Sequence, residues 1–116
     1  MRWFNVDIGK ERVMQLRGKQ KRFLRAQANH LQPLFSVGKD GLTDNWLAQL
    51  DGALDRRELI KVSILQNSDV TTDEVRQMIE EKTDIQVVQV IGRVLVLFKV
   101  SANKDARGLS SRVAEI

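Results

Sequence analysis

The feature that most constrains the fold is the order in which two kinds of apolar pattern follow one another along the chain. Three segments repeat apolar residues at helical spacing, and four short runs read as strands, in the order helix, strand, helix, strand, helix, strand, strand. Helical crossovers make the connected strands parallel, whereas the two-residue link in the last pair makes that pair antiparallel. The chain of 116 residues therefore predicts one α/β domain, in which three helices pack on a four-stranded mixed sheet.

Local signals set the expected ends of these segments. The residue before a proline avoids helical geometry, so Pro33 ends the first helix near Leu31. The run Thr71-Thr72-Asp73-Glu74 is a capping box that starts the third helix, and Gly92-Arg93 suits a two-residue type II′ turn. The predicted helices cover residues 16–31, 43–55 and a segment from Thr71 onward. The predicted strands cover residues 34–37, 58–65, 85–91 and 94–100, and we expect the first of them and the last pair to be buried.

The two ends of the chain carry weaker patterns than residues 14–100, which form the predicted domain. Phe4, Val6 and Ile8 alternate and allow a short extra strand, but we interpret residues 1–13 as a flexible leader. We therefore expect a chain that begins at Met14 to fold and bind like the full chain. Residues 101–116 form a polar tail that we expect to be loosely ordered.

Charge is distributed unevenly along the chain, whose net charge is +4. Residues 1–39 contain nine Lys or Arg and two acids, a net charge of +7. Residues 40–90 contain five Lys or Arg and eleven acids, a net charge of −6. Residues 91–116 contain five Lys or Arg and two acids, a net charge of +3. This polarity indicates a basic surface that faces a polyanion and an acidic remainder that faces away from it.

The basic residues are densest in the first predicted helix, where residues 17–25 hold five bases and no acid. A solvated helix face usually mixes both signs, whereas uncompensated bases repel one another, so the run favours a polyanionic partner over plain solvation. On a helical wheel the apolar side chains fall on one side. Four bases lie opposite that side or beside it: Lys19, Lys21, Arg22 and Arg25.

A glycine-flanked loop, VGKDGLT (residues 37–43), joins the first predicted strand to the second helix. Glycine lets a phosphate approach the backbone closely, Lys39 adds a full charge, and a helix that starts at Thr43 presents unpaired N–H groups. The candidate anion-binding residues are Gly38, Lys39, Asp40 and Gly41. The alternative interpretation is a plain tight turn whose backbone needs two glycines.

Other functional classes find little support. The chain has no cysteine, which fits a reducing cytoplasm, and a single histidine, His30, so we expect no metal site and no cofactor. The run from Gly38 to Gly41 lacks the length and the Lys-Ser/Thr ending of a nucleotide-hydrolysing loop. Asp51 and Asp55 lie four residues apart on the second predicted helix, and we interpret them as solvated acids and not as a catalytic pair. We therefore expect no catalytic residues. No apolar run is long enough to span a bilayer.

Four stretches together carry a family resemblance: LRGKQKRFLR (16–25), HLQP (30–33), VGKDGLT (37–43) and VIGRVLVLFK (90–99). In this order and spacing they resemble a bacterial CRM domain of the YhbY type; CRM stands for chloroplast RNA splicing and ribosome maturation. The resemblance covers about residues 14–100. It implies a fold similar to that of the C-terminal domain of translation initiation factor three.

The resemblance also implies an RNA-binding protein that associates with precursors of the large ribosomal subunit. No membrane and no small-molecule substrate are implied, and we expect a monomer. The RNA contacts of the family carry over to the loop, at Gly38, Lys39, Asp40 and Gly41, and to the first helix, at Lys19, Lys21, Arg22 and Arg25. Asp40 departs from the uncharged polar residue that the family often has there, and capping of the second helix is an alternative role for it.

The chain has only two tryptophans, four phenylalanines and no tyrosine, and most of the six fall on predicted core faces. We therefore expect recognition of RNA shape and backbone more than of base sequence. Two other binding classes are alternatives. A basic helix also suits an acidic protein partner, which salt and nuclease sensitivity would distinguish from RNA. A DNA-binding helix-turn-helix is disfavoured because the first helix leads into a strand.

Overall fold

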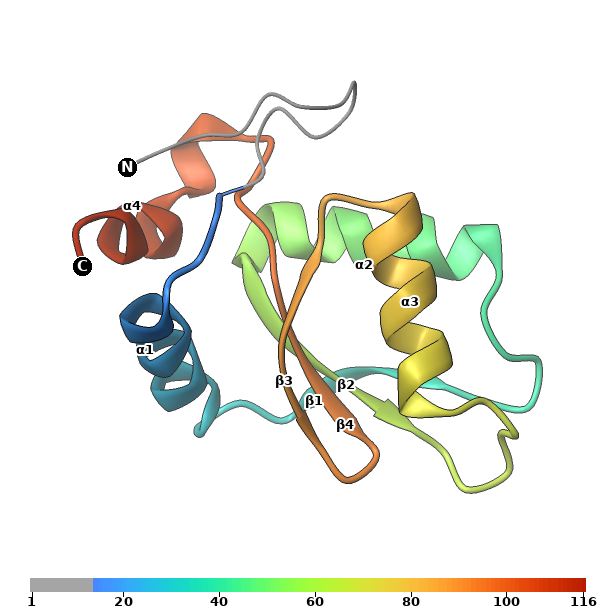
Figure 1. Cartoon of the computed structure of the whole chain (residues 1–116). Helices are drawn as coiled ribbons and strands as arrows, with labels where there is room; N and C mark the ends of the chain where they lie inside the picture. The colour runs from blue at the N-terminus through green and yellow to red at the C-terminus, as the bar shows by residue number, and fades with distance from the viewer. Residues whose placement is uncertain (1–13) are drawn as a thin grey trace.

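In the computed structural model, which describes residues 14–116, the elements follow one another in the expected order, with a further helical segment at the end (Figure 1). Phe4, Val6 and Ile8 lie outside the described residues. No helix in the described part is long and apolar enough to cross a membrane. The helices are α1 (Gly18–Ala28), α2 (Asp44–Arg57), α3 (Thr72–Lys82) and α4 (Gly108–Ala114), with a 3-10 turn η1 (Lys104–Ala106) before α4. The strands are β1 (Pro33–Val37), β2 (Leu59–Ile64), β3 (Gln86–Ile91) and β4 (Val94–Phe98).

The four strands form one mixed sheet in the order β1-β2-β4-β3. β1 runs parallel to β2, as expected for strands joined by a helix, and β4 runs antiparallel to both of its neighbours. Gly92 has a φ of +59°, which is the positive value that a type II′ turn requires at its first central residue. The α/β class and the mixed four-stranded sheet are thereby confirmed.

Each face of the sheet has its own hydrophobic core. One face is covered by α2 and α3, whose buried side chains pack with Ile60, Val62 and Ile64 of β2. The opposite face is covered by α1 and α4, which contribute Leu24 and Val113 to a second cluster. Figure 1 shows the sheet between these two pairs of helices. The arrangement sets α1 on the side of the sheet away from α2 and α3.

The starts of α2 and α3 are capped as the sequence predicts. The Thr71 hydroxyl accepts the Glu74 N–H, and the Glu74 carboxylate accepts the Thr71 N–H, each at 3.1 Å. This reciprocal pair is the capping box, and it satisfies two N–H groups that the helix leaves unpaired. At α2 the Thr43 hydroxyl accepts the Trp46 N–H at 3.0 Å.

β1 is not the buried strand that its apolar sequence suggests. It lies at the edge of the sheet, Leu34 is 47% exposed, and Val37 is the one residue of the strand that is buried. An edge strand has a neighbour on one side only, and a short apolar run does not reveal that position. β1 therefore forms part of the molecular surface between α1 and the loop that follows β1.

The C-terminal segment is ordered, so the expectation of a loosely ordered tail is wrong, and four helices pack on the sheet instead of three. Ser110 and Val113 of α4 are buried. The buried Glu58 carboxylate, just after α2, accepts the Ser101 N–H at 2.7 Å and the Ser110 N–H at 2.9 Å. A polar tail becomes structured here because a distant carboxylate satisfies its backbone donors.

Asp51 and Asp55 are not simply solvated acids, which corrects the interpretation from sequence. Both carboxylates lie 2.8 Å from the ammonium of Lys99, whose side chain is 2% exposed. A buried charge is costly unless it is paired, and two carboxylates supply that pairing. The two acids therefore have a structural partner and join α2 to the end of β4.

Candidate nucleic-acid interface

The basic face of α1 lies on the molecular surface. Lys19, Lys21 and Arg22 are exposed, whereas Arg25 is half-buried. None of the four makes an ion pair with another residue in 14–116. The four charges predicted from the sequence are thus brought together on one helix, and no acidic side chain of the described residues pairs with them.

The opposite face of α1 is fixed to the C-terminal segment. The Gln20 side chain is buried; its amide donates to the Val113 carbonyl at 3.0 Å, and its oxygen accepts the Arg17 N–H at 2.8 Å. The guanidinium of Arg112 lies 5.1 Å from the centre of the Phe23 ring, within the range of a cation–π contact. The basic face is therefore held on a braced helix, which limits the entropy lost when a ligand binds.

Residues 38–41 form a hydrogen-bonded turn, called here the glycine turn. The Gly41 N–H donates to the Gly38 carbonyl at 3.0 Å, and Lys39 and Asp40 between them are exposed. Gly41 has a φ of +70°, so its backbone favours glycine. Gly38 has no such requirement, and a Cβ there would meet the Leu65 side chain at an ordinary 3.8 Å. Folding therefore explains Gly41 more fully than Gly38.

The start of α2 is separated from the glycine turn and is already partly satisfied. Thr43 caps the helix, and Asp44 places a negative charge in its first turn. Asp40 makes no capping hydrogen bond, so the alternative role considered for it is wrong. The unpaired N–H groups of the helix start are thus less available to an anion than the sequence suggests. The groups that remain for such a contact are those of the glycine turn itself, including Lys39.

The structure does not bring the two predicted contact regions together. The glycine turn follows the end of β1 and α1 precedes its start, and Figure 1 shows them at opposite ends of the sheet. A five-residue strand spans roughly 16 Å, so a ligand that touches both regions must extend at least that far.

Polar residues that sequence reasoning did not propose lie between these regions. Lys61 and Ser63 follow Leu59 on β2 by two and four residues, so all three share the sheet face on which α1 packs. The strand register places Ser36 of β1 beside Ser63. The alternation along β2 was visible in the sequence, but the pairing of Ser36 with Ser63 depends on register. We call the basic face of α1, these three residues and the glycine turn the candidate interface.

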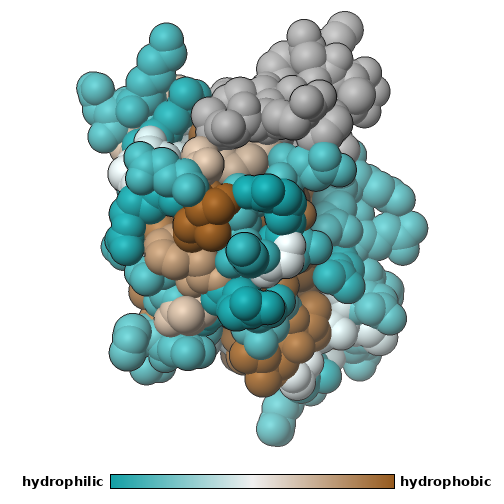
Figure 2. Space-filling view, turned by 60° about the vertical axis from the view of Figure 1, so that its left-hand side comes forward, coloured by the Kyte–Doolittle hydropathy of each residue, from teal (hydrophilic) through white to brown (hydrophobic). Residues whose placement is uncertain are grey.

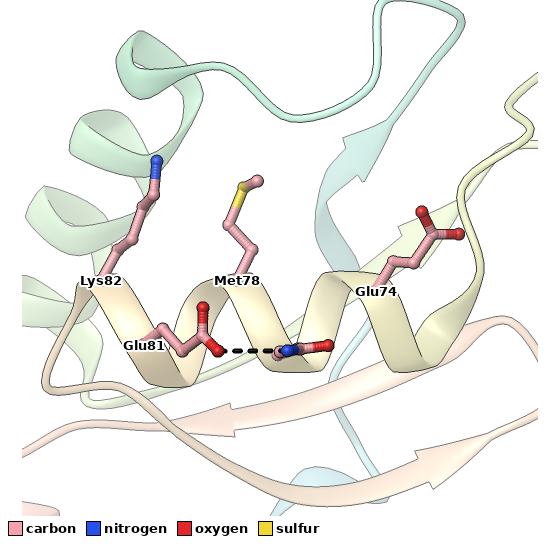
Figure 3. A pocket seen from close by; sticks show the side chains of 5 residues that line it. Glu74, Met78, Glu81 and Lys82 are labelled. Carbon is pink, nitrogen blue, oxygen red and sulfur yellow. Dashed lines mark hydrogen bonds between the residues drawn. The ribbon is translucent and has the colours of Figure 1, made fainter.

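The acidic residues lie mainly on the other side of the sheet. The charged residues that line a shallow hollow on α3 are Glu74, Glu81 and Lys82, and the Gln77 amide donates to the Glu81 carboxylate at 3.1 Å (Figure 3). Met78, which also lines this hollow, packs against the hydrophobic core. The two carboxylates of this hollow outnumber its one ammonium group and repel phosphates, so the hollow does not favour a nucleic acid. Figure 2 brings the side of α1 and α4 forward and shows hydrophilic side chains around separate hydrophobic patches.

The described residues offer little for other chemistry. No group of three or more His, Cys, Asp or Glu within 14–116 is placed to hold a metal ion. None of Phe23, Phe35, Trp46 and Phe98 is fully exposed, so the described surface lacks an open aromatic platform on which bases could stack. Charge and backbone groups dominate the candidate interface.

Comparison with known proteins identifies the family. The model of the CRS1 / YhbY (CRM) domain matches residues 16–99. The chain belongs to the CRM domain family. The match begins just before α1 and ends just after β4, so it includes the basic helix, the glycine turn and all four strands.

Curated relatives cover most of this CRM domain. Probable RNA-binding protein YqeI of Bacillus subtilis is 50% identical over 86 residues, which are 74% of this chain and 90% of the relative. An RNA-binding protein of Haemophilus influenzae is 40% identical over 83 residues, 72% of this chain and 84% of the relative. The solution structure of a hypothetical protein of Staphylococcus aureus, for which RNA binding has been suggested, superposes with a TM-score of 0.64. It is 41% identical in sequence and covers 78% of this chain and 94% of its own.

Proposed function

We propose that this CRM domain binds RNA through the backbone of the nucleic acid. The observation that carries the proposal is the basic face of α1, which makes no ion pair within residues 14–116, in a family whose relatives are named RNA-binding proteins. Lys19, Lys21, Arg22 and Arg25 would contact phosphates at one end of β1. The turn residues Gly38, Lys39, Asp40 and Gly41 would contact the backbone at the other end, with Lys39 supplying the charge.

The RNA that we propose is ribosomal RNA in precursors of the large subunit, and the contribution of the protein is binding without catalysis. A protein that reads shape and backbone gains selectivity from surfaces that are exposed only before assembly closes over them. Two contact regions separated by the length of β1 suit a structured RNA, because such an RNA holds its phosphates at fixed distances. The location that fits this role is the cytoplasm.

Binding to a structured RNA is expected to weaken steeply as salt is added. Four to six phosphate contacts would give a slope of about −3 to −5 in a plot of log affinity against log salt concentration. Affinity measured by fluorescence anisotropy at several salt concentrations gives the slope. A slope near zero would contradict the proposal. An acidic protein partner would also bind more weakly in salt, but with a shallower slope, because it does not carry the condensed counterions of a nucleic acid. Nuclease treatment of a complex isolated from cells is the second test, since only an RNA complex is lost.

Replacement of Lys39 by alanine is expected to lower RNA affinity about tenfold, because it removes one charge at a close contact. The melting temperature should stay nearly unchanged, since Lys39 is exposed and makes no ion pair within residues 14–116. Lys104→Ala, at an exposed lysine of η1, is the matched control and should bind like the parent. If Lys39→Ala also binds like the parent, residues 38–41 are only a turn.

A further inference from the structure

The stretch at residues 30–33 resembles the family but has no role in the candidate interface. His30, Leu31 and Gln32, together with Leu34 of β1, line one side of a groove of about 250 Å³. Arg57 at the end of α2 and the first residues of β2 complete its lining. The groove lies at the start of β1, between α1 and the strand that leads to the glycine turn. It is therefore continuous with the surface proposed to bind RNA.

The described lining of this groove combines an apolar wall with groups that recognise nucleotides. Leu34 is 47% exposed, and it forms part of the groove wall. His30 and Arg57 are exposed, and both imidazole and guanidinium planes stack on bases. The Arg57 guanidinium can also donate two parallel hydrogen bonds to a phosphate. No carboxylate occurs among the described lining residues, so a polyanion meets no repulsion there.

Two further basic residues lie close to the lining residues in the sequence. Arg25 lies in the last turn of α1, and Arg56 lies beside Arg57 in the last turn of α2. The volume falls below the roughly 300–1,000 Å³ of pockets that hold drug-sized ligands, so one base is the part of an RNA that fits. A base inside a paired helix has both of its faces covered by stacking. Only an unpaired base can enter.

We propose that this groove holds one unpaired base of the RNA that α1 and the glycine turn bind. Leu34 packs against the base, and Arg57 contacts the phosphate beside it. The inference rests on the proposed function and makes it more specific, because it adds a preference for a helix interrupted by a bulge or a loop over an uninterrupted helix. A protein side chain in the same groove is the competing occupant, and the test separates the two.

The test uses two RNA hairpins of equal length, one with a single bulged uridine in its stem and one with a fully paired stem. The parent protein should bind the bulged hairpin more tightly. Leu34→Ser and Arg57→Gln should each weaken binding to the bulged hairpin about fivefold, in keeping with the loss of one base contact, and should affect the paired hairpin much less. The matched controls are Ile91→Ser, at an apolar residue 52% exposed on β3, and Arg76→Gln, at an exposed arginine of α3. Both controls should bind like the parent.

Photo-crosslinking locates the base directly. A 4-thiouridine at the bulge should crosslink to residues 30–34 of the parent, and mass spectrometry of the digested complex identifies the peptide. Equal affinity of the parent for the two hairpins, or unchanged binding by Leu34→Ser and Arg57→Gln, would overturn the base site while leaving RNA binding in place. Failure to bind either hairpin would overturn the base site and the proposed function together.

Discussion

A variant carrying Lys19→Glu and Arg22→Glu is expected to disappear from the fractions that contain immature large ribosomal subunits, where we expect the unaltered protein to sediment. The two side chains are exposed, lie one turn apart on α1, and make no ion pair within residues 14–116. Replacing two phosphate contacts by repulsion should lower RNA affinity by about 100-fold and make the salt slope shallower by about two. Gradient fractionation of cell extract, probed for this protein, gives the distribution.

The control for this experiment reverses two charges elsewhere. Arg76→Glu with Lys104→Glu changes the net charge by the same amount at exposed residues of α3 and η1, and should leave the sedimentation unchanged. Arg25 is avoided because it is half-buried, so its reversal would also disturb the packing of α1. Unaltered protein found wholly in ribosome-free fractions at low salt, while precursors are abundant, would count against the assembly role. Continued co-sedimentation of the double variant would count against α1 as the contact.

The parts of the fold that the sequence predicts are those set by local interactions. The capping box that starts at Thr71 involves residues three apart, and the turn at Gly92 depends on one backbone angle. The edge position of β1 is different, because it depends on the order of the strands, and an apolar run of four or five residues looks the same at an edge and in the middle. The ordered C-terminus is a second such case: Glu58 anchors residues that follow it by more than forty positions.

The same division applies to the candidate site. The bases of α1 can be recognised from sequence because a run of one sign without compensation is a local property, and the structure places them on a surface. The distance between that surface and Lys39 is a property of the sheet, and no spacing along the chain expresses it. The groove beside Leu34 is assembled from residues 30–34 and 57–60, which meet only after β1 and β2 pair. The HLQP stretch supplies three of the lining residues, but nothing in that stretch indicates that residues 57–60 lie beside it.

Replacement of Glu58 by alanine is expected to lower the free energy of unfolding by about 3–5 kcal/mol, which corresponds to a fall in melting temperature of roughly 15–25 °C. The buried carboxylate accepts three hydrogen bonds: from the N–H groups of Ser101 and Ser110, at 2.7 and 2.9 Å, and from the Ser110 hydroxyl at 2.7 Å. Alanine leaves the two N–H donors without an acceptor in a buried site, and each unsatisfied group costs about 1–3 kcal/mol. The Ser110 hydroxyl can still donate to the Arg107 carbonyl, which lies 3.3 Å away. Thermal unfolding followed by circular dichroism measures the loss.

Three comparisons separate the anchor from other effects of the substitution. Glu115→Ala removes an exposed acid of the same segment and should change stability by no more than about 0.5 kcal/mol. Glu58→Gln keeps one carbonyl acceptor and should lose about half as much as alanine. Hydrogen exchange at the Ser101 and Ser110 amides should accelerate in Glu58→Ala before exchange in the β-sheet does.

Because Gln20 of α1 donates to the Val113 carbonyl, release of α4 should also loosen the basic face and weaken RNA binding. A Glu58→Ala protein within 1 kcal/mol of the parent, with both amides still protected, would show that the C-terminal segment is held by its apolar contacts instead.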